Sequence, residues 1–246
     1  MRKYILAIAI VIAVAMTMGM AVRPTLPAGV YSPGAPHAPS GYTVTYAHNF
    51  TSQGRGDWVT QPYSNATDSI STRFGFGIEV TGEDQWSEII SSDAVVGPNS
   101  FVQALVYIPA VGPKKLAANW PAFWTTGAVW PQNGEIDMLE GSAGRSCLFT
   151  HYGTPSHHVN PPGQCAALGS AVGWVTISML RTGGQVTAWY GSVKIGTIPL
   201  PLNANHELIF DNQDGPDDIC QACNGPLVYP TTAWLSRVTV WNKGRP

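Results

Sequence analysis

The chain has 246 residues, a formal net charge of -2 and 11% charged residues, where a globular domain usually carries about 25%. Its 26 Gly, 20 Pro, 9 Trp and 9 Tyr favour an all-β domain rich in turns over a helical one. Only 13 Lys and Arg are present, so the sequence excludes a basic nucleic-acid surface and favours a neutral partner.

The first 28 residues are predicted to be an export signal. Two basic residues precede an apolar run from Ile5 to Val22, and Gly19 and Ala21 are small residues suited to cleavage. The run is also long enough to cross a bilayer as an uncleaved anchor, and this alternative stays open. In either case we expect the rest of the chain to be secreted or extracellular, with no membrane contact by the mature domain.

A Pro- and Gly-rich linker is predicted over residues 29–41, because five prolines lie between Arg23 and Ser40. Residues 42–246 then form one domain of a size that suits a single β-sandwich. No long stretch repeats apolar residues with helical spacing, so we expect no substantial helix. Strand composition or alternation is found at 42–46, 101–108, 172–180, 186–190, 207–210 and 235–241.

Three carboxylates, Glu135, Asp137 and Glu140, lie within six residues of an apolar, strand-favouring segment. Side chains alternate along a strand, so Glu135 and Asp137 share a face and Glu140 should point away. A β-bulge at Met138 or Leu139 would reverse that parity and gather all three on one face. The structural alternative is a solvated acidic edge strand, which the apolar neighbours disfavour.

Gathered carboxyl groups match the chemistry of glycosidic bond hydrolysis with retention. That reaction uses one carboxylate that attacks the anomeric carbon and one carboxylic acid that protonates the leaving oxygen. We expect Glu135 to be the nucleophile, Glu140 the acid/base, and Asp137 the group that orients Glu135 and holds a shared proton. Repulsion between the three groups would separate their pKa values, so that one stays ionised while another keeps its proton.

The run from Glu135 to Glu140, preceded by Trp120-Pro-Ala-Phe-Trp124, resembles the catalytic signature of glycoside hydrolase family 16. The form is the bulged E-x-D-x-x-E of laminarinases, agarases and carrageenases. The resemblance is strong over about residues 118–141 and weaker from Phe101 to the end. It implies a β-jelly-roll sandwich of the concanavalin A type, a concave substrate cleft, and retaining endo-hydrolysis of a β-linked polysaccharide, most often β-1,3-glucan.

The same resemblance implies sugar-binding roles for Trp120 and Trp124, which border the cleft in the family, and for His151 on the following strand. Trp130, in the loop entering the catalytic strand, is a more exposed candidate platform for a sugar ring. Near the C-terminal end, Asn212 is the residue we assign to the cleft, although its neighbours Asp211 and Gln213 are equal alternatives.

Two departures from the family pattern concern the site and calcium. Ala104 or Leu105 replaces an arginine that commonly reaches the site. Ser236 replaces an aspartate that often helps to hold structural calcium. We therefore predict no cofactor and no catalytic metal, and leave structural calcium open.

Four cysteines in an exported chain are expected to form disulfides. Proximity along the chain favours Cys147 with Cys165 and Cys220 with Cys223, out of three pairings.

Three functions remain in competition. The first is an endo-β-1,3-glucanase of the laminarin type. The second is a transglycosylase that uses the same covalent intermediate, and the third is a non-catalytic β-glucan-binding module of the cell surface. Galactans such as agarose stay open as substrates within the first class. We expect a monomer that acts on a neutral polysaccharide.

Overall fold

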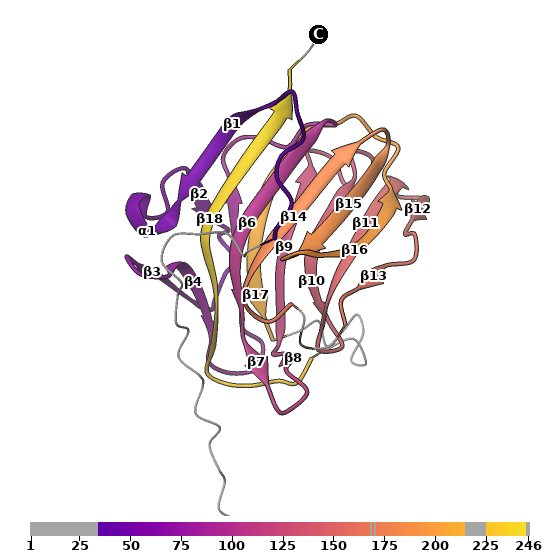
Figure 1. Ribbon diagram of the computed structural model, residues 1–246. Coiled ribbons are helices and arrows are strands. Elements are labelled where there is room, and N and C mark those ends of the chain that lie inside the picture. Colours follow the sequence, from indigo (N-terminus) through magenta and orange to yellow (C-terminus); the bar gives the residue numbers. More distant parts are fainter. Residues whose placement is uncertain (1–33, 168, 170, 215–224, 245–246) are drawn as a thin grey trace, which may run out of the picture.

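The computed structural model describes residues 34–167, 169, 171–214 and 225–244 as two β-sheets stacked face to face (Figure 1). The predicted all-β sandwich is confirmed, and α1 (Phe50–Gln53) is a single helical turn. Within this part of the chain, no helix is long and apolar enough to cross a membrane. The predicted export signal, residues 1–28, and the Cys220–Cys223 pairing lie outside the described residues.

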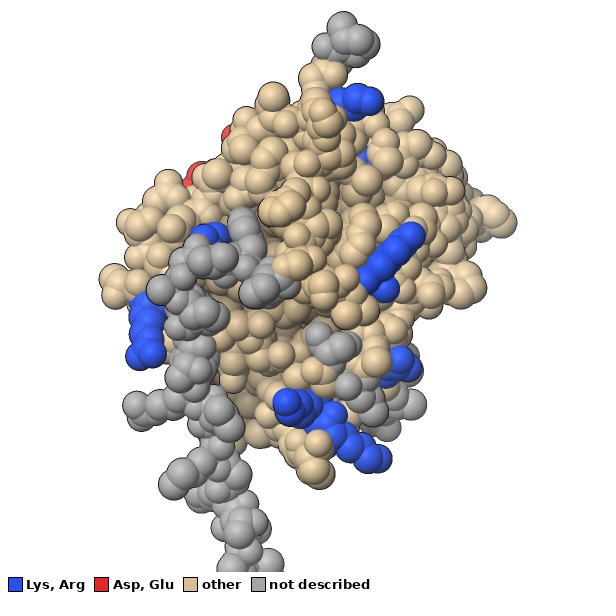
Figure 2. All heavy atoms as spheres, viewed as in Figure 1, with Lys and Arg blue, Asp and Glu red and all other residues tan. Residues whose placement is uncertain are grey.

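The first sheet contains the strands predicted near both ends of the domain. Its members are β1 (Tyr42–Asn49), β3 (Thr67–Ser71), β4 (Gly75–Val80), β6 (Ser100–Ile108), β14 (Gly173–Thr182), β15 (Gln185–Tyr190), β16 (Val193–Pro199) and β18 (Thr231–Lys243). The spatial order is β16-β15-β14-β6-β18-β4-β3, with β1 beside β18. In Figure 2, which shows the molecule from the same side as Figure 1, Lys and Arg are scattered and form no basic patch on this face.

The second sheet carries the acidic strand. Its members are β2 (Trp58–Thr60), β5 (Trp86–Ser91), β9 (Trp120–Gly127), β10 (Glu135–Ser142), β11 (Arg145–Thr154), β12 (His157–Val159), β13 (Gln164–Cys165) and β17 (His206–Gln213). The order is β12-β11-β10-β9-β17-β5-β2, with β13 beside β11. A small separate hairpin joins β7 (Ala110–Val111) to β8 (Leu116–Ala117). The antiparallel pairing places β10 near the middle of its sheet, flanked by β9 and β11.

The core lies between the two sheets and follows from the alternation of apolar residues. On β6, Val102, Ala104 and Val106 point inward, and on the opposite sheet Ile136 and Phe210 do the same; all are at most 1% exposed. Burial of each of the Val, Ile and Phe side chains stabilises the fold by roughly 1.5–3 kcal/mol. On β10, the apolar residues Ile136, Met138 and Leu139 are buried in this core, which leaves the other face of the strand for polar groups.

The described part of the predicted linker, residues 34–41, lies against the first sheet. Gln103 Nε2 on β6 donates a hydrogen bond to the Pro36 carbonyl oxygen at 2.6 Å, and Ala35 is buried. The strand β1 begins at Tyr42, at the predicted domain start. The folded part of the chain therefore includes residues before that boundary.

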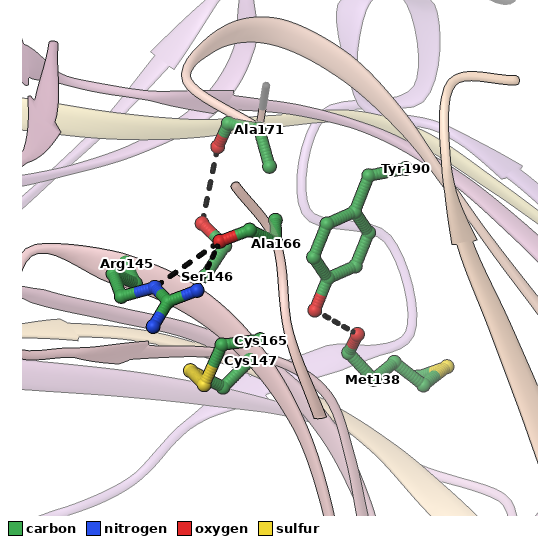
Figure 3. Close-up of a disulfide and its surroundings, with 8 residues drawn as sticks. All are labelled: Met138, Arg145, Ser146, Cys147, Cys165, Ala166, Ala171 and Tyr190. Carbon is green, nitrogen blue, oxygen red and sulfur yellow. Dashed lines mark hydrogen bonds between the residues drawn. A yellow bond between two sulfur atoms is a disulfide. The ribbon is translucent and has the colours of Figure 1, made fainter. Parts of the chain in front are cut away.

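One predicted disulfide is confirmed. Cys147 on β11 and Cys165 on β13 are paired in register and their sulfur atoms are bonded (Figure 3). Beside them, Ser146 Oγ donates to the Ala171 carbonyl at 3.1 Å, and the Arg145 guanidinium donates two hydrogen bonds to the Ala166 carbonyl. These contacts attach the chain that follows β13 to β11, the strand directly beside the acidic strand β10.

Candidate active site

The predicted β-bulge is present in β10. The register of β10 against β11 shifts between Asp137 and Glu140, and against β9 it shifts between Asp137 and Leu139. Met138 and Leu139 are both fully buried, so two consecutive apolar side chains point into the core. Because Leu139 points to the same side as Met138, the alternation of side chains is reversed after the bulge. Glu140 therefore lies on the outer face with Glu135 and Asp137.

A tyrosine of the opposite sheet donates a hydrogen bond to the bulged backbone. The bulge leaves Met138 without a register partner on either neighbouring strand. The Tyr190 hydroxyl on β15 donates to the Met138 carbonyl oxygen at 2.9 Å (Figure 3). Tyr190 is 1% exposed, and a buried carbonyl without a donor would be costly. The first sheet therefore stabilises the irregular backbone that places Glu140.

Burial raises the pKa of each of the three carboxyl groups. Burial and then the neighbouring Asp137 raise the pKa of Glu135 to about 8 and that of Glu140 to about 8. Burial raises the pKa of Asp137 from 3.8 to about 7, although its own backbone hydrogen bond lowers it. Because each group disfavours ionisation of the others, the three release their protons stepwise.

His151 faces the carboxyl groups from β11, where it is the register partner of Glu135. Its Nε2 lies 3.3 Å from Asp137 Oδ2 and 3.7 Å from Glu135 Oε1. The ring lowers the pKa of Glu135 and of Glu140 by its charge. Glu135, Asp137 and His151 are also the one group of potential metal-ligating side chains found among the described residues. They are the groups that acid/base chemistry needs here, and we assign no metal to them.

The predicted tryptophans take three different positions. The Trp120 indole is 8% exposed and hydrogen bonds to Glu140, whereas the Trp130 indole is 52% exposed and hydrogen bonds to Glu135. Trp124 is half-buried, and its Nε1 donates to Asp211 Oδ2 at 2.6 Å. Trp124 and Trp130 line a pocket of about 380 Å³ together with Glu135. Among the three, Trp130 is the most accessible surface for a sugar ring.

The assignment of Asn212 to the cleft is wrong. Asn212 is fully buried, and its Nδ2 donates to the Ile78 carbonyl of the opposite sheet at 3.1 Å. Alternation along β17 turns Asp211, the register partner of Ala122 and Glu88, to the outer face. Burial, followed by the charge of Glu88, raises the pKa of Asp211 well above its usual range. The polar residue of this strand that accompanies the site is therefore Asp211.

Further pocket residues come from segments that the sequence analysis did not single out. Glu88 on β5 lines the pocket, and burial raises its pKa to about 7. Tyr63 donates to Glu88 Oε1 at 3.4 Å and stacks on Trp86, with ring centroids 4.5 Å apart. The alternation in Trp86-Ser-Glu88 would have predicted this strand, but not which sheet it joins.

The loop that carries Trp130 is held by His206, another residue that the sequence did not reveal. His206 on β17 is fully buried; its Nε2 lies 2.8 Å from the Asn133 carbonyl oxygen and its Nδ1 lies 2.9 Å from Thr125 Oγ1. Burial, followed by the charge of Arg181, lowers the pKa of His206 to about 3. A neutral ring that donates from Nε2 and accepts at Nδ1 satisfies both contacts and anchors the loop before β10.

Residues 99–160 match the family model described as the XgeA-like catalytic GH16 domain. This segment contains β10 and β11 and therefore every carboxyl group of the triplet as well as His151. The match concerns the sequence of this segment and therefore supports the resemblance independently of the fold.

Two curated fungal proteins are similar over part of the chain. A probable endo-1,3(4)-beta-glucanase of Aspergillus niger is 30% identical over 103 residues, covering 42% of this chain and 13% of that protein. The endo-1,3(4)-beta-glucanase xgeA of Emericella nidulans is 30% identical over 133 residues, covering 44% of this chain and 21% of that protein. The chain thus corresponds to a minor part of these longer relatives.

Among solved structures, a non-specific endo-beta-1,3(4)-glucanase from family GH16 superposes with a TM-score of 0.66. The alignment covers 89% of this chain and 98% of that chain at 18% identity, a level at which the likeness concerns the fold. The matched segment, the shared fold and the bulged acidic strand therefore all agree with the resemblance to glycoside hydrolase family 16.

Proposed function

We propose that this protein is a secreted retaining endo-glycosidase that hydrolyses neutral β-glucan, with β-1,3-linked glucan of the laminarin type as its preferred substrate. One observation carries the proposal: the bulge in β10 brings Glu135, Asp137 and Glu140 onto one face, beside a pocket lined by aromatic residues. Carboxyl groups that differ in protonation beside an aromatic platform are what retaining hydrolysis of a sugar chain requires.

In the first step, the Glu135 carboxylate attacks the anomeric carbon while the bond from that carbon to the glycosidic oxygen breaks. Glu140 gives its proton to the departing oxygen, and a glycosyl ester of Glu135 forms. In the second step, the Glu140 carboxylate removes a proton from water as the water oxygen attacks the same carbon. The ester bond breaks, Glu135 leaves as a carboxylate, and two inversions give retention.

The assignment of the two roles follows the order of the two glutamates in the bulged signature. Burial and the charge of Asp137 favour the protonated form of both, while His151 and a tryptophan indole, Trp130 for Glu135 and Trp120 for Glu140, favour the ionised form. Glu135 is the glutamate whose carboxyl group lies 3.7 Å from His151 Nε2, a contact that suits the residue that must be ionised to attack. Asp137 lies between them in sequence with its Oδ2 close to His151, where it can hold the proton that the group shares.

The choice of β-glucan rests on the composition of the pocket and on the relatives. Its walls combine Tyr63, Trp124 and Trp130 with the carboxyl groups of Glu88 and Glu135, and no Lys or Arg is among its lining residues. Aromatic faces pack against the apolar faces of a glucose ring, while carboxylates accept hydrogen bonds from its hydroxyls. The curated relatives carry endo-1,3(4)-beta-glucanase names, although the chain spans only 13% and 21% of their lengths.

Secretion is part of the proposal because two features support it. The N-terminal sequence has the order of a signal peptide, with basic residues before an apolar run. The Cys147–Cys165 disulfide is of the kind that persists in an oxidising compartment. N-terminal sequencing of the protein recovered from the culture medium would test this part.

The first test is the release of reducing ends from laminarin, curdlan, lichenan, agarose and κ-carrageenan. Glu135→Gln and Glu140→Gln serve as blanks, and each should lower turnover by roughly 10³-fold or more with an unchanged circular dichroism spectrum. Activity on laminarin or curdlan that these variants lose would support the proposal. Wild-type turnover in both variants would refute the assignment of the pair, and glucan binding without cleavage by the wild type would favour a binding module.

Azide rescue separates the two roles. With Glu135→Ala, azide can enter from the side of the missing nucleophile while Glu140 still protonates the leaving group, and the product is a glycosyl azide of inverted configuration. With Glu140→Ala and an activated aryl glycoside, azide replaces water in the second step and the glycosyl azide retains its configuration. Proton NMR of the anomeric position identifies each product, and the opposite pattern would exchange the two assignments.

A further inference from the structure

His158 occupies the rim of the site without touching the carboxyl groups. It lies on β12, which forms a hairpin with β11, and its register partner is Gly153. The hairpin is tight at this point: Gly153 has a φ of +109°, and a Cβ there would overlap the His157 carbonyl oxygen. Both restraints hold the backbone of His158 in one place relative to β11.

The His158 ring contacts two residues that belong to the site. Its Nε2 lies 3.2 Å from His151 Nδ1, and the two rings stack with centroids 5.2 Å apart. On its other side, the ring meets Trp130 edge to face at a centroid distance of 5.0 Å. One exposed histidine thus connects the strand after the catalytic one with the loop before it.

His151 and Trp130 both contact Glu135, the proposed nucleophile. His151 Nε2 lies 3.7 Å from Glu135 Oε1, and the Trp130 indole hydrogen bonds to the same carboxyl group. His158 is therefore placed to restrain Glu135 from both flanks through contacts that do not involve Glu135 itself.

The hydrogen bond between the two rings couples their proton positions. Only one hydrogen lies between His151 Nδ1 and His158 Nε2, so one ring donates and the other accepts. When His158 donates, neutral His151 carries its proton on Nε2, the atom that faces Glu135 and Asp137. When neutral His151 donates instead, its bare Nε2 faces the carboxyl oxygens, which an ionised carboxylate disfavours because both atoms are then acceptors. His158 thus supplies the donor that lets His151 present its own hydrogen to the carboxyl groups.

We propose that His158 is a positioning residue for the nucleophile, acting through His151 and Trp130. The proposal rests on the proposed function, in which Glu135 attacks the anomeric carbon. Loss of the ring-to-ring hydrogen bond frees His151 to rotate and removes the partner of its Nδ1, so that Nε2 is no longer held toward Glu135, which slows the attack without altering how sugar binds.

Two matched variants separate the two contacts. His158→Phe keeps an aromatic ring against Trp130 and removes the hydrogen bond to His151. His158→Gln places an amide near the former Nε2 and removes the ring. The neighbouring His157 is also exposed, but strand alternation turns it to the opposite face, so His157→Phe is the control.

The readout is covalent trapping of Glu135 by dinitrophenyl 2-deoxy-2-fluoro-β-laminaribioside. Dinitrophenolate leaves without a proton from Glu140, so the maximal inactivation rate reports the nucleophilic step, and the half-saturating concentration reports binding. We expect His158→Phe to lower the maximal rate roughly threefold to tenfold at an unchanged half-saturating concentration, as the loss of one hydrogen bond implies. His158→Gln should recover most of the rate, and His157→Phe should match the wild type.

A wild-type rate in His158→Phe, or a change confined to the half-saturating concentration, would overturn the positioning role while the proposed function stands. Peptide mass spectrometry of the trapped wild type keeps the two questions apart. A wild-type protein that carries no label on Glu135 would refute the proposed function, and the role of His158 with it.

Discussion

Replacing Asp137 by Asn should lower turnover. It should also change the free energy of unfolding more favourably at pH 8 than at pH 4. Asp137 is 6% exposed, and its Oδ2 has no hydrogen-bond partner among the described residues. Burial raises its pKa from 3.8 to about 7. Between pH 3.8 and about 7, folded Asp137 keeps a proton that the unfolded chain has already released. The free energy of unfolding therefore declines as the pH rises through this range.

The size of the effect follows from the two pKa values. Their difference is about three pH units, and each unit corresponds to about 1.4 kcal/mol, so ionised Asp137 costs the fold up to about 4 kcal/mol above pH 7. Asn carries no charge at any pH and removes this cost. Because Asp137 also raises the pKa values of Glu135 and Glu140, its neutralisation additionally lets them ionise at lower pH.

The assay is urea unfolding followed by tryptophan fluorescence at pH 4 and pH 8, for the wild type and Asp137→Asn. The relevant quantity is the stability change caused by the substitution at pH 8 minus the change at pH 4, since packing effects that are independent of pH cancel. We expect this difference to be positive and between about 1 and 4 kcal/mol. The exposed Asp93→Asn is the control. A difference of zero, or one of opposite sign, would refute the reasoning.

Three further predictions concern the disulfide, the bulge and the platform. Replacing Cys147 and Cys165, which are 18 residues apart, by Ser should lower the free energy of unfolding by about 3 kcal/mol, and an unchanged urea midpoint would contradict this. Tyr190→Phe leaves the Met138 carbonyl without its donor, so we expect the free energy of unfolding in urea to fall by about 1–3 kcal/mol and kcat on laminarin to be lower. An unchanged kcat would show that the bulge holds Glu140 without this bond. Trp130→Ala removes an indole that is 52% exposed and should raise KM for laminarin roughly fivefold to tenfold in initial-rate assays, whereas an unchanged KM would mean that no sugar rests on this ring.

The acidic strand and its irregularity were predictable from the sequence because both are local properties. Three carboxylates and three apolar residues can occupy opposite faces of one strand only if a bulge falls between Asp137 and Glu140, and the register confirms it there. The same locality explains why the strand at 101–108 and the Cys147–Cys165 pair were predictable. Each depends on alternation or proximity within a short stretch of chain.

The surroundings of the carboxyl groups depended on tertiary structure. For β17, the choice between Asp211 and Asn212 required the pairing with β9 and β5, because a slip of one residue exchanges the two faces. His158 meets Trp130 only because the β11–β12 hairpin folds back over the loop before β10.

The bond from Tyr190 to Met138 needed the two sheets to stack, since 52 residues separate its partners. Short-range patterning therefore determined which groups carry the chemistry. Strand pairing and sheet stacking decided which residues surround the carboxyl groups. Those contacts join segments that are far apart along the chain, so no short stretch of sequence predicts them.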